Sequence, residues 1–263
     1  MIQFIHNHKI MNKKNILLIC IFLVLLVGIG FSYYTFNKTV PVVEIKDSLF
    51  STYLKNKSET FTENTDWYEA KIDYPKDNQK VRDQIFEQWN NFVKENKLKD
   101  FTDTKSAREA LGIQDSEITY AFSAEYKMVS SQNTISYVYN IYTFTGGAHG
   151  ASNIYPITYN DKLELLSVDK LLPDDKLEKV AKLAYADILK QKKERLKSSG
   201  MSEKEIEESL KDESWLSEGT SPTRDNYSSV WYDKEDMVIN FGQYQVGPYA
   251  EGMYEVRIPF SSI

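Results

Sequence analysis

The chain has 263 residues, of which 41% are hydrophobic and 27% are charged, a composition typical of a globular protein with one large or two small domains. Its single cysteine, Cys20, lies near the N-terminus, which excludes a disulfide framework, a cysteine-ligated zinc site and a thiol nucleophile from the rest of the chain. The formal net charge of −6 divides into +3 for residues 1–35, which hold three lysines and no acid, and −9 for the remainder.

Residues 16–36 combine an uncharged apolar run, "ILLICIFLVLLVGIGF", with three aromatic residues at its C-terminal end. Their number approaches the roughly 20 residues that a helix needs to cross ~30 Å of hydrocarbon, so they predict a transmembrane anchor. Lysines precede this run and none lies inside it, so the positive-inside rule places residues 1–15 in the cytoplasm as a short tail. The C-terminal body would then lie outside the cell membrane.

A cleaved signal peptide is the alternative for this segment, and it would give a secreted protein. The apolar run is long for a signal peptide, and Gly28-Ile29-Gly30 is a poor substitute for the usual small-residue cleavage site. Lipid attachment at Cys20 is disfavoured, because Leu-Leu-Ile precedes this residue where small residues are expected. We therefore expect an uncleaved single-pass anchor.

The segment at residues 37–66 is rich in Lys, Asn, Ser and Thr and has few periodic signals, so it predicts a stalk. Beyond it, residues 67–263 are numerous enough to bury a core and form the predicted extracytoplasmic domain. The elements of this domain fall into two halves, at about residues 67–165 and 166–263.

The first half of the domain shows clear periodicity. The alternation in "AKIDYP" predicts a short strand that ends at a proline. Helical spacing of apolar residues in "DNQKVRDQIFEQWNNFVKENK" predicts an amphipathic helix that lies on a sheet. Residues 118–128 alternate, which predicts a strand with one face in the core and one in solvent. Residues 134–144 are apolar on both faces and predict a central strand that leads into Gly146 and Gly147.

The second half has a different set of elements. The segment "DDKLEKVAKLAYADILKQKKERLK" predicts a second long helix, with acids at its start and bases in its last turns, as the helix dipole favours. Its apolar stripe consists of Leu177, Val180, Ala181, Ala184 and Ile188. Ser202 and Glu205 have the spacing of a capping box, which predicts the start of a short acidic helix. A hairpin around Asp233 to Asp236 and a last strand in "EGMYEVRIPF" complete the domain.

Strands outnumber helices in the first half, and adjacent strands are too close in sequence for crossover connections. We therefore predict an α+β fold with a mainly antiparallel sheet and two longer amphipathic helices, preceded by one transmembrane helix.

The stretch "YTFTGGAHGASNIYPITYN", residues 142–160, holds His149, the only histidine outside the N-terminal tail. A metal site usually needs three or four ligands, and a catalytic triad needs a nucleophile in a setting such as G-x-S-x-G, which is absent from the sequence. A glycosidase carboxylate pair is not singled out among 38 acids. The favoured interpretation is structural: Gly146 and Gly147 supply positive φ angles or close approach, and His149 hydrogen-bonds across the turn. Recognition would be a secondary role of this exposed loop.

The stretch "YQVGPYAEG" predicts a rigid loop bracketed by two glycines and a proline. Tyr244, Tyr249 and Glu251 would be available to face a partner, and tyrosine gives contact area at a low entropy cost. The alternative is a structural hairpin whose tyrosines fill the core, and the residues alone leave both open.

Several motifs occur in a characteristic order from about residue 69 to the C-terminus: "IDYP" followed by the helix with Trp89-Asn90, "YTFTGGAHG", "NIYPITYN", "LLSVDKLLP" and "YQVGPYAEGMYEVRIPFSSI". In these motifs the chain resembles the extracellular domain family shared by the anti-sigma factor RsiV and the N-terminal part of the peptidoglycan deacetylase PdaC. The resemblance implies a cell-envelope binding or sensing domain outside a bacterial membrane. In RsiV the domain recognises lysozyme, which triggers proteolysis and release of the sigma factor.

The effector parts of that family are not expected in this sequence. RsiV-like proteins carry a sigma-binding segment before the membrane span, whereas residues 1–15 are too few to bury a core. PdaC-like proteins continue into a catalytic domain, whereas this sequence stops at Ile263.

We therefore expect a membrane-anchored, extracytoplasmic binding or sensing protein of the bacterial envelope that is not an enzyme. The resemblance implies a lysozyme-like cationic protein as its partner, which the acidic body would attract. A module that binds cell-wall glycan (peptidoglycan) is the alternative, and an uncharacterised hydrolase is the third possibility. We expect no catalytic residues, metal, cofactor or nucleic-acid partner. The candidate binding residues are Gly146, Gly147, His149, Tyr244, Tyr249 and Glu251.

Overall fold

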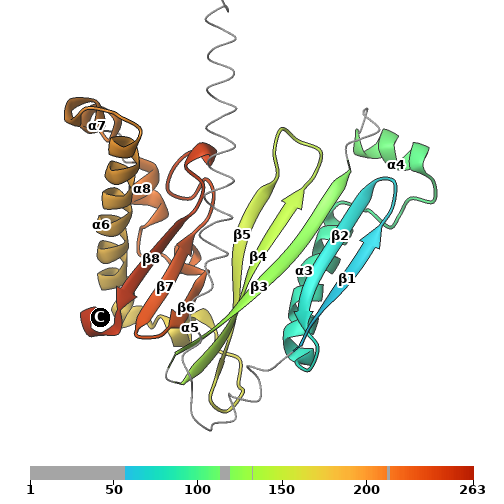
Figure 1. Cartoon of the computed structure of the whole chain (residues 1–263), viewed down its shortest axis with the longest axis horizontal. Coiled ribbons are helices and arrows are strands. Elements are labelled where there is room, and N and C mark those ends of the chain that lie inside the picture. Colours follow the sequence, from blue (N-terminus) through green and yellow to red (C-terminus); the bar gives the residue numbers. More distant parts are fainter. Residues whose placement is uncertain (1–56, 113–118, 132, 212–213) are drawn as a thin grey trace, which may run out of the picture.

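The computed structural model describes residues 57–112, 119–131, 133–211 and 214–263 (Figure 1). The expected cytoplasmic tail, the expected anchor at residues 16–36 and most of the expected stalk lie outside the described residues. Within the described residues, no helix is both long enough and apolar enough to cross a membrane.

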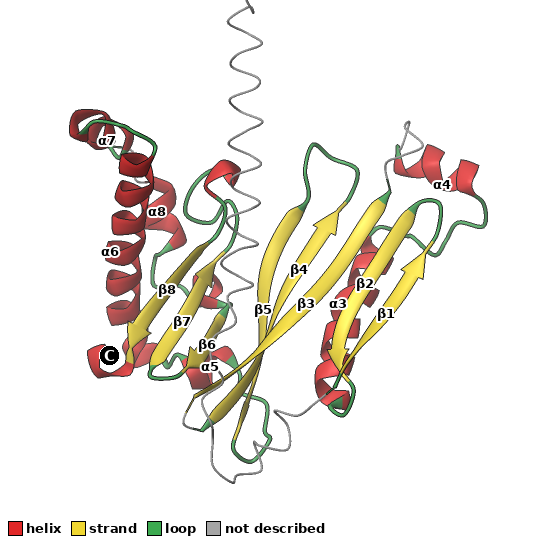
Figure 2. Cartoon of the chain, viewed as in Figure 1, coloured by secondary structure: helices red, strands yellow, loops and turns green. Residues whose placement is uncertain are grey.

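The fold is α+β, as predicted, with two separate sheets (Figure 2). The strands are β1 (Ser58–Asn64), β2 (Tyr68–Pro75), β3 (Tyr120–Ser131), β4 (Thr134–Phe144), β5 (Ala151–Asn160), β6 (Val230–Asp233), β7 (Asp236–Phe241) and β8 (Tyr254–Pro259). The helices are α3 (Gln79–Glu95), α4 (Thr104–Leu111), α5 (Val168–Leu171), α6 (Asp174–Ser198), α7 (Glu203–Ser209) and α8 (Ser214–Gly219). Three short 3₁₀ turns are η1 (Arg224–Tyr227), η2 (Tyr249–Glu251) and η3 (Phe260–Ser262).

Sheet A has the strand order β1-β2-β3-β4-β5, and α3 packs on one of its faces. The predicted helical stripe is buried at Val81, Ile85, Trp89 and Phe92, and the side chain of Asn78 caps the helix by accepting a hydrogen bond from the backbone of Val81. β4 lies between β3 and β5 and is largely buried on both faces, which confirms the prediction of a central strand.

One pair of neighbouring strands departs from the predicted antiparallel arrangement. β2 and β3 run parallel, with Tyr68 opposite Tyr120 and Ile72 opposite Ala124. The prediction that adjacent strands are too close for a crossover is wrong at this point, because α3 and α4 lie between these strands in the sequence and return the chain to the same end of the sheet. Sheet A is therefore mixed, whereas sheet B is antiparallel.

The sheet also begins earlier in the chain than the sequence indicates. Residues 58–64, which the sequence analysis assigns to the stalk, form β1 and pair with β2. Phe61 is the apolar residue that binds this strand to the core, where its ring meets that of Phe86 at 5.2 Å between centroids. A single aromatic residue among Ser, Glu and Thr gives too weak an alternation to predict a strand.

Sheet B has the order β6-β7-β8, and α6 covers one of its faces. All five residues of the predicted α6 stripe are buried. They share an apolar cluster with inward-facing residues of β7 and β8, including Ile239, Tyr254 and Val256. Ser202 and Glu205 form both hydrogen bonds of the predicted capping box at the start of α7.

Three apolar clusters place the layers in the order helix, sheet, sheet, helix. One cluster lies between α3 and sheet A, and another lies between sheet B and α6. A smaller cluster between the sheets joins Val138 and Ile154 of sheet A to Trp231 and Val238 of sheet B. Because strand side chains alternate between faces, Tyr137 and Tyr139 of β4 pack in the α3 core, whereas Val138 packs between the sheets.

Hydrogen bonds at the turns reinforce this seam. The backbone N–H of Lys234 donates to Ser130 O at 3.1 Å, and Ser131 Oγ donates to Lys234 O at 2.6 Å. Ser229 Oγ donates to Ile154 O at 2.9 Å. The C-terminal end of β3 is thus held against the β6–β7 turn.

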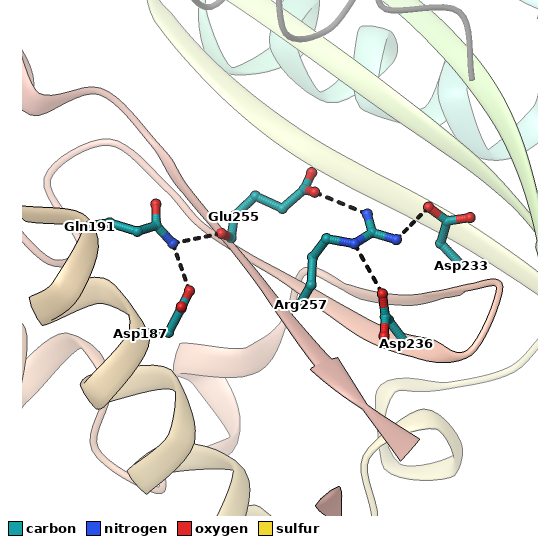
Figure 3. A network of polar contacts seen from close by, with 6 residues as sticks. All are labelled: Asp187, Gln191, Asp233, Asp236, Glu255 and Arg257. Carbon is teal, nitrogen blue, oxygen red and sulfur yellow. Dashed lines mark hydrogen bonds and ion pairs between the residues drawn. The ribbon is translucent and has the colours of Figure 1, made fainter. Parts of the chain in front are cut away.

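The strand β8 is held on both sides by polar contacts (Figure 3). Gln191 Nε2 of α6 donates to Asp187 Oδ2 at 2.7 Å and to Glu255 O at 2.9 Å. Arg257 forms ion pairs with three surrounding carboxylates, those of Asp233 at 2.7 Å, Asp236 at 3.2 Å and Glu255 at 3.2 Å. These contacts fix the strand that follows the loop at residues 242–252.

Candidate binding site

The turn between β4 and β5 carries the Gly-Gly-Ala-His motif. Gly146 has a φ of +81°, in the region that glycine adopts without strain, whereas Gly147 has no positive φ. Gly150 is buried, and a Cβ added there would lie 2.3 Å from the ring of Tyr142. Gly146 therefore supplies the positive φ that the sequence predicts, and the close approach occurs at Gly150 rather than at Gly147.

His149 lies in this exposed turn and has a hydrogen-bond partner at each ring nitrogen. Its Nδ1 is 3.1 Å from Gly150 O, and its Nε2 is 3.2 Å from the hydroxyl of Tyr244. A carbonyl oxygen can only accept, so Nδ1 carries the proton of the neutral ring and Nε2 accepts from Tyr244. The imidazole also stacks on the ring of Tyr249, at 3.6 Å between centroids and an interplanar angle of 19°. His149 thereby joins the β4–β5 turn to the 242–252 loop.

The 242–252 loop holds its tyrosines in defined positions. Tyr244 has a φ of +66°, which is uncommon for a side chain of this size and costs on the order of 1–3 kcal/mol. The Gln245 side chain stabilises this conformation, because its Oε1 accepts from Gly242 N at 3.0 Å and its Nε2 donates to Gly219 O at 3.1 Å. The hydroxyl of Tyr249 donates to Gly150 O at 3.0 Å.

Glu251 is turned toward α6 instead of toward the tyrosines of the loop. Its Oε2 accepts from Lys192 Nζ at 2.7 Å and from the Tyr254 hydroxyl at 2.6 Å, and its backbone O accepts from Arg195 at 2.6 Å. Burial raises the pKa of Tyr254, and the hydrogen bond to Glu251 acts in the same direction. Glu251 therefore holds the loop on the helix.

The short helix α8 adds a third segment to the site. Gly219, at its end, packs against the loop so closely that an added Cβ would lie 2.0 Å from Gln245 O. The Trp215 ring, near the start of α8, lies 6.4 Å from the Tyr244 ring between centroids.

These segments form a continuous surface that we call the aromatic patch, defined as Tyr142, His149, Trp215, Tyr244 and Tyr249. Four large apolar side chains stand out as exposed among the described residues, and three of them belong to the patch: Tyr142 at 38%, Trp215 at 45% and Tyr244 at 53%. The fourth, Leu165 at 52%, is on the β5–α5 connection. Partial burial raises the pKa of Tyr142, with Tyr249 contributing in the same direction, so this hydroxyl is neutral at physiological pH.

The contacts of His149 define what this surface can do chemically. Its hydrogen-bond partners are a backbone carbonyl and a phenol, whereas the histidine of a serine-type triad contacts a carboxylate and a serine hydroxyl. Among the described residues, no group of three or more His, Cys, Asp or Glu side chains is arranged to hold a metal ion. The patch offers ring faces, hydroxyl groups and a fixed backbone, which are the features of a binding surface.

The structure brings together three of the six candidate residues, His149, Tyr244 and Tyr249. Gly146 and Gly147 lie beside them in the exposed turn, whereas Glu251 contacts α6. Sequence reasoning missed Tyr142 and Trp215. Trp215 is a lone tryptophan within a strongly acidic run. A large aromatic residue is unexpected on a solvated helix face, and this was the sequence signal for it.

Two segments of the chain match known families. Residues 61–152 match a family described as deacetylase PdaC, and residues 169–261 match a protein family of unknown function, DUF3298. The peptidoglycan-N-acetylmuramic acid deacetylase PdaC of Bacillus subtilis strain 168 is 28% identical over 128 residues, which are 47% of this chain and 24% of that protein. The matched region thus spans about a quarter of the length of this curated relative.

A solved structure shows the same fold. The crystal structure of a DUF3298 family member from Bacteroides fragilis NCTC 9343 has a TM-score of 0.53 at 18% identity, with 79% of this chain and 90% of that one covered.

The aromatic patch is built from both matched segments. Tyr142 and His149 lie in the PdaC-type segment, whereas Trp215, Tyr244 and Tyr249 lie in the DUF3298-type segment. Together the two matches confirm the resemblance to the PdaC and RsiV-like domain family that the motifs predict.

Proposed function

We propose that this chain is a non-catalytic recognition protein of the bacterial cell envelope, anchored by residues 16–36, and that the aromatic patch contacts its ligand. The observation that carries the proposal is the gathering of exposed Tyr142, Trp215 and Tyr244 on one surface built by three separate segments. Large exposed side chains on soluble domains are usually scattered, so a cluster of this kind points to an interaction.

The physical character of the patch suits recognition. Tyrosine and tryptophan dominate binding energy at interfaces, because they bury much area and lose little side-chain entropy. The hydrogen bonds of His149 and Tyr249 and the close packing at Gly150 fix these rings before any ligand arrives. A surface that is already ordered loses less free energy on binding.

The leading ligand is a cationic protein of the lysozyme kind, which the family resemblance implies for this domain. The chain after residue 35 carries a formal charge of −9, so it attracts a basic protein over a distance of about one Debye length, ~8 Å at physiological salt. Charge raises the association rate, and the patch supplies the selectivity that charge lacks.

A cell-wall glycan is the second candidate ligand, and the pair of Trp215 and Tyr244 favours it. Their rings are exposed, lie 6.4 Å apart between centroids and are tilted by 59° to each other, so they offer two differently oriented aromatic surfaces to the apolar face of a sugar ring. The relative from Bacillus subtilis is named as a deacetylase of a peptidoglycan sugar, which fits an envelope glycan.

Titration calorimetry of the purified full chain separates these candidates. Lysozyme is the test ligand, cytochrome c is the cationic control, and soluble peptidoglycan fragments are the glycan arm. We expect saturable binding of lysozyme that weakens from 0.1 M to 1 M salt, with much weaker binding of cytochrome c. Equal binding of both proteins would mean that overall charge alone attracts them and that the patch does not select lysozyme. Binding of the fragments alone, with little response to salt, would establish the glycan module instead.

A further inference from the structure

The outer face of α6 carries a row of lysines on a body that is otherwise acidic. At 3.6 residues per turn, five lysines fall within a sector of about 80° opposite the buried stripe of the helix. These residues, which we call the lysine row, are Lys179, Lys182, Lys190, Lys193 and Lys197. All five are exposed, and the remaining position of the row is held by Ala186. At 1.5 Å per residue the row is about 27 Å long.

Intrahelical contacts account for only part of this row. Lys182 pairs with Glu178 at 2.7 Å, and Lys190 lies 3.9 Å from Glu194. Lys179, Lys193 and Lys197 have no ion pair among the described residues. The helix dipole favours Lys197 in the last turn but does not favour Lys179, which is one turn from the acidic N-terminal end.

We propose that the lysine row is a second binding surface, which takes a linear polymer with repeating phosphate groups. A small anion could meet only two neighbouring lysines, such as Lys193 and Lys197, whereas an extended polymer can follow all five. Lysine is a compact point charge that suits phosphate oxygens without demanding a fixed geometry.

The surroundings of the row favour a polymer over a lipid surface. A helix that lies on a membrane inserts apolar side chains, but the apolar stripe of α6 is buried against sheet B. The row also carries no aromatic side chain on which a base could stack, so it offers charge along a backbone and no base recognition. The carboxylates of Asp175, Glu178 and Glu194 flank the row and repel phosphate groups. The bound polymer must therefore follow the lysines along the outer face of the helix.

This surface is distinct from the aromatic patch. Lys192 and Arg195, on the other side of α6, contact Glu251 and hold the 242–252 loop, whereas the row lies opposite the stripe that packs on sheet B. A defect in one surface should therefore leave ligand binding at the other unchanged.

The test measures binding of long-chain inorganic polyphosphate to the full chain. The row variant combines Lys179→Gln, Lys193→Gln and Lys197→Gln. Its matched control combines Lys80→Gln, Lys94→Gln and Lys162→Gln, which removes the same charge from exposed positions elsewhere. We expect the row variant to bind polyphosphate at least tenfold more weakly and to reduce the slope of log affinity against log salt concentration by about 2, while the control changes affinity less than threefold.

Three further probes identify the chemistry. Orthophosphate should not compete at equal phosphate concentration, and polyglutamate should bind more weakly. Binding to phosphatidylglycerol vesicles, which the proposed anchor supports, should be the same for the row variant and the unmodified chain. Equal losses in the row variant and the control would overturn the proposal, because attraction would then depend on overall charge. Absence of polyphosphate binding to the unmodified chain, or a larger loss of vesicle binding than of polyphosphate binding in the row variant, would also overturn it. Lysozyme binding by the row variant reports on the aromatic patch separately.

Discussion

Three buried glycines allow the segments of the aromatic patch to approach one another. An added Cβ would lie 2.3 Å from the Tyr142 ring at Gly150, 2.0 Å from Gln245 O at Gly219, and 2.6 Å from Glu251 Oε2 at Gly247. The neighbours of Gly150 and Gly247 are side chains, which can move. The neighbour of Gly219 is backbone, so this position tolerates a side chain least.

Gly219→Ala is therefore expected to lower the free energy of unfolding by about 2 kcal/mol or more, since α8 must move away from the loop. Gly147→Ala is the matched control, because nothing lies within 4 Å of a Cβ there and its φ is not positive. Its effect should stay within about 0.5 kcal/mol. Urea unfolding followed by circular dichroism measures both, and equal stabilities would contradict the packing described here.

Glu251 also acts at the residue scale, as an anchor for the loop. Glu251→Ala leaves the largely buried Lys192 and the Tyr254 hydroxyl without their acceptor, so we expect a loss of about 1–3 kcal/mol in the free energy of unfolding. In a Lys192→Met background the loss should be smaller, because no buried charge is then left unpaired. A double-mutant cycle with no coupling would show that the ion pair does not hold the loop.

At the scale of elements, sheet A carries tyrosines whose ionisation is coupled to folding. Burial raises the pKa of Tyr68 to about 12, with its hydrogen bond to Glu63 in the same direction, and burial raises the pKa of Tyr159 to about 12. An unfolded tyrosine titrates near ~10, so the fold favours the neutral phenol. Stability from these groups is complete below pH ~10 and is lost as the pH rises toward about 12.

We therefore expect the free energy of unfolding to be level up to pH ~9.5 and to decrease between pH ~10 and 12. The double variant Tyr68→Phe, Tyr159→Phe should show a smaller decrease over that interval, because two of the ionising groups are gone. Urea unfolding at a series of pH values measures this. A decrease of unchanged size in the double variant would assign the alkaline loss to other groups.

The elements that could be predicted are those in which the buried residues recur at a regular spacing along the sequence. The stripes of α3 and α6 and the two apolar faces of β4 follow directly from spacing. β1 escaped prediction because Phe61 is its only large apolar residue, and α4 because Ala107 is its only buried one. The parallel pairing of β2 with β3 depends on contacts far apart in sequence, which no local pattern contains.

The candidate site divides in the same way. Glycine and tyrosine content identified the β4–β5 turn and the 242–252 loop as separate features. Their meeting through His149 and Tyr249 depends on how the two sheets pack, and a sequence pattern does not contain that information. Trp215 was missed because the acidic residues around it are typical of a solvated helix.

At the scale of the whole molecule, one small seam connects the two sheets and so holds the parts of the patch together. Trp231 is almost fully buried there with Val138, Ile154 and Val238. The hydrogen bonds of Lys234 and Ser229 add to this seam. The relative position of His149 and Tyr249 therefore depends on a cluster distant from both.

Trp231→Ala should lower the free energy of unfolding by about 3–5 kcal/mol, because it leaves a large cavity between the sheets. Amide hydrogen exchange should show faster exchange in β4 as well as in β7, since both lose a packing partner. Faster exchange confined to sheet B would mean that the sheets are stable independently of the seam.

Alanine substitution at matched exposed positions shows whether the aromatic patch binds the ligand. Tyr244→Ala and Trp215→Ala remove exposed rings from the patch, whereas Leu165→Ala removes an equally exposed apolar side chain outside it. In calorimetric titrations of the full chain with lysozyme, we predict that each patch variant raises Kd at least tenfold, because aromatic residues dominate interface energy, while Leu165→Ala changes Kd less than twofold. Patch variants that bind lysozyme as tightly as the unmodified chain would contradict this account.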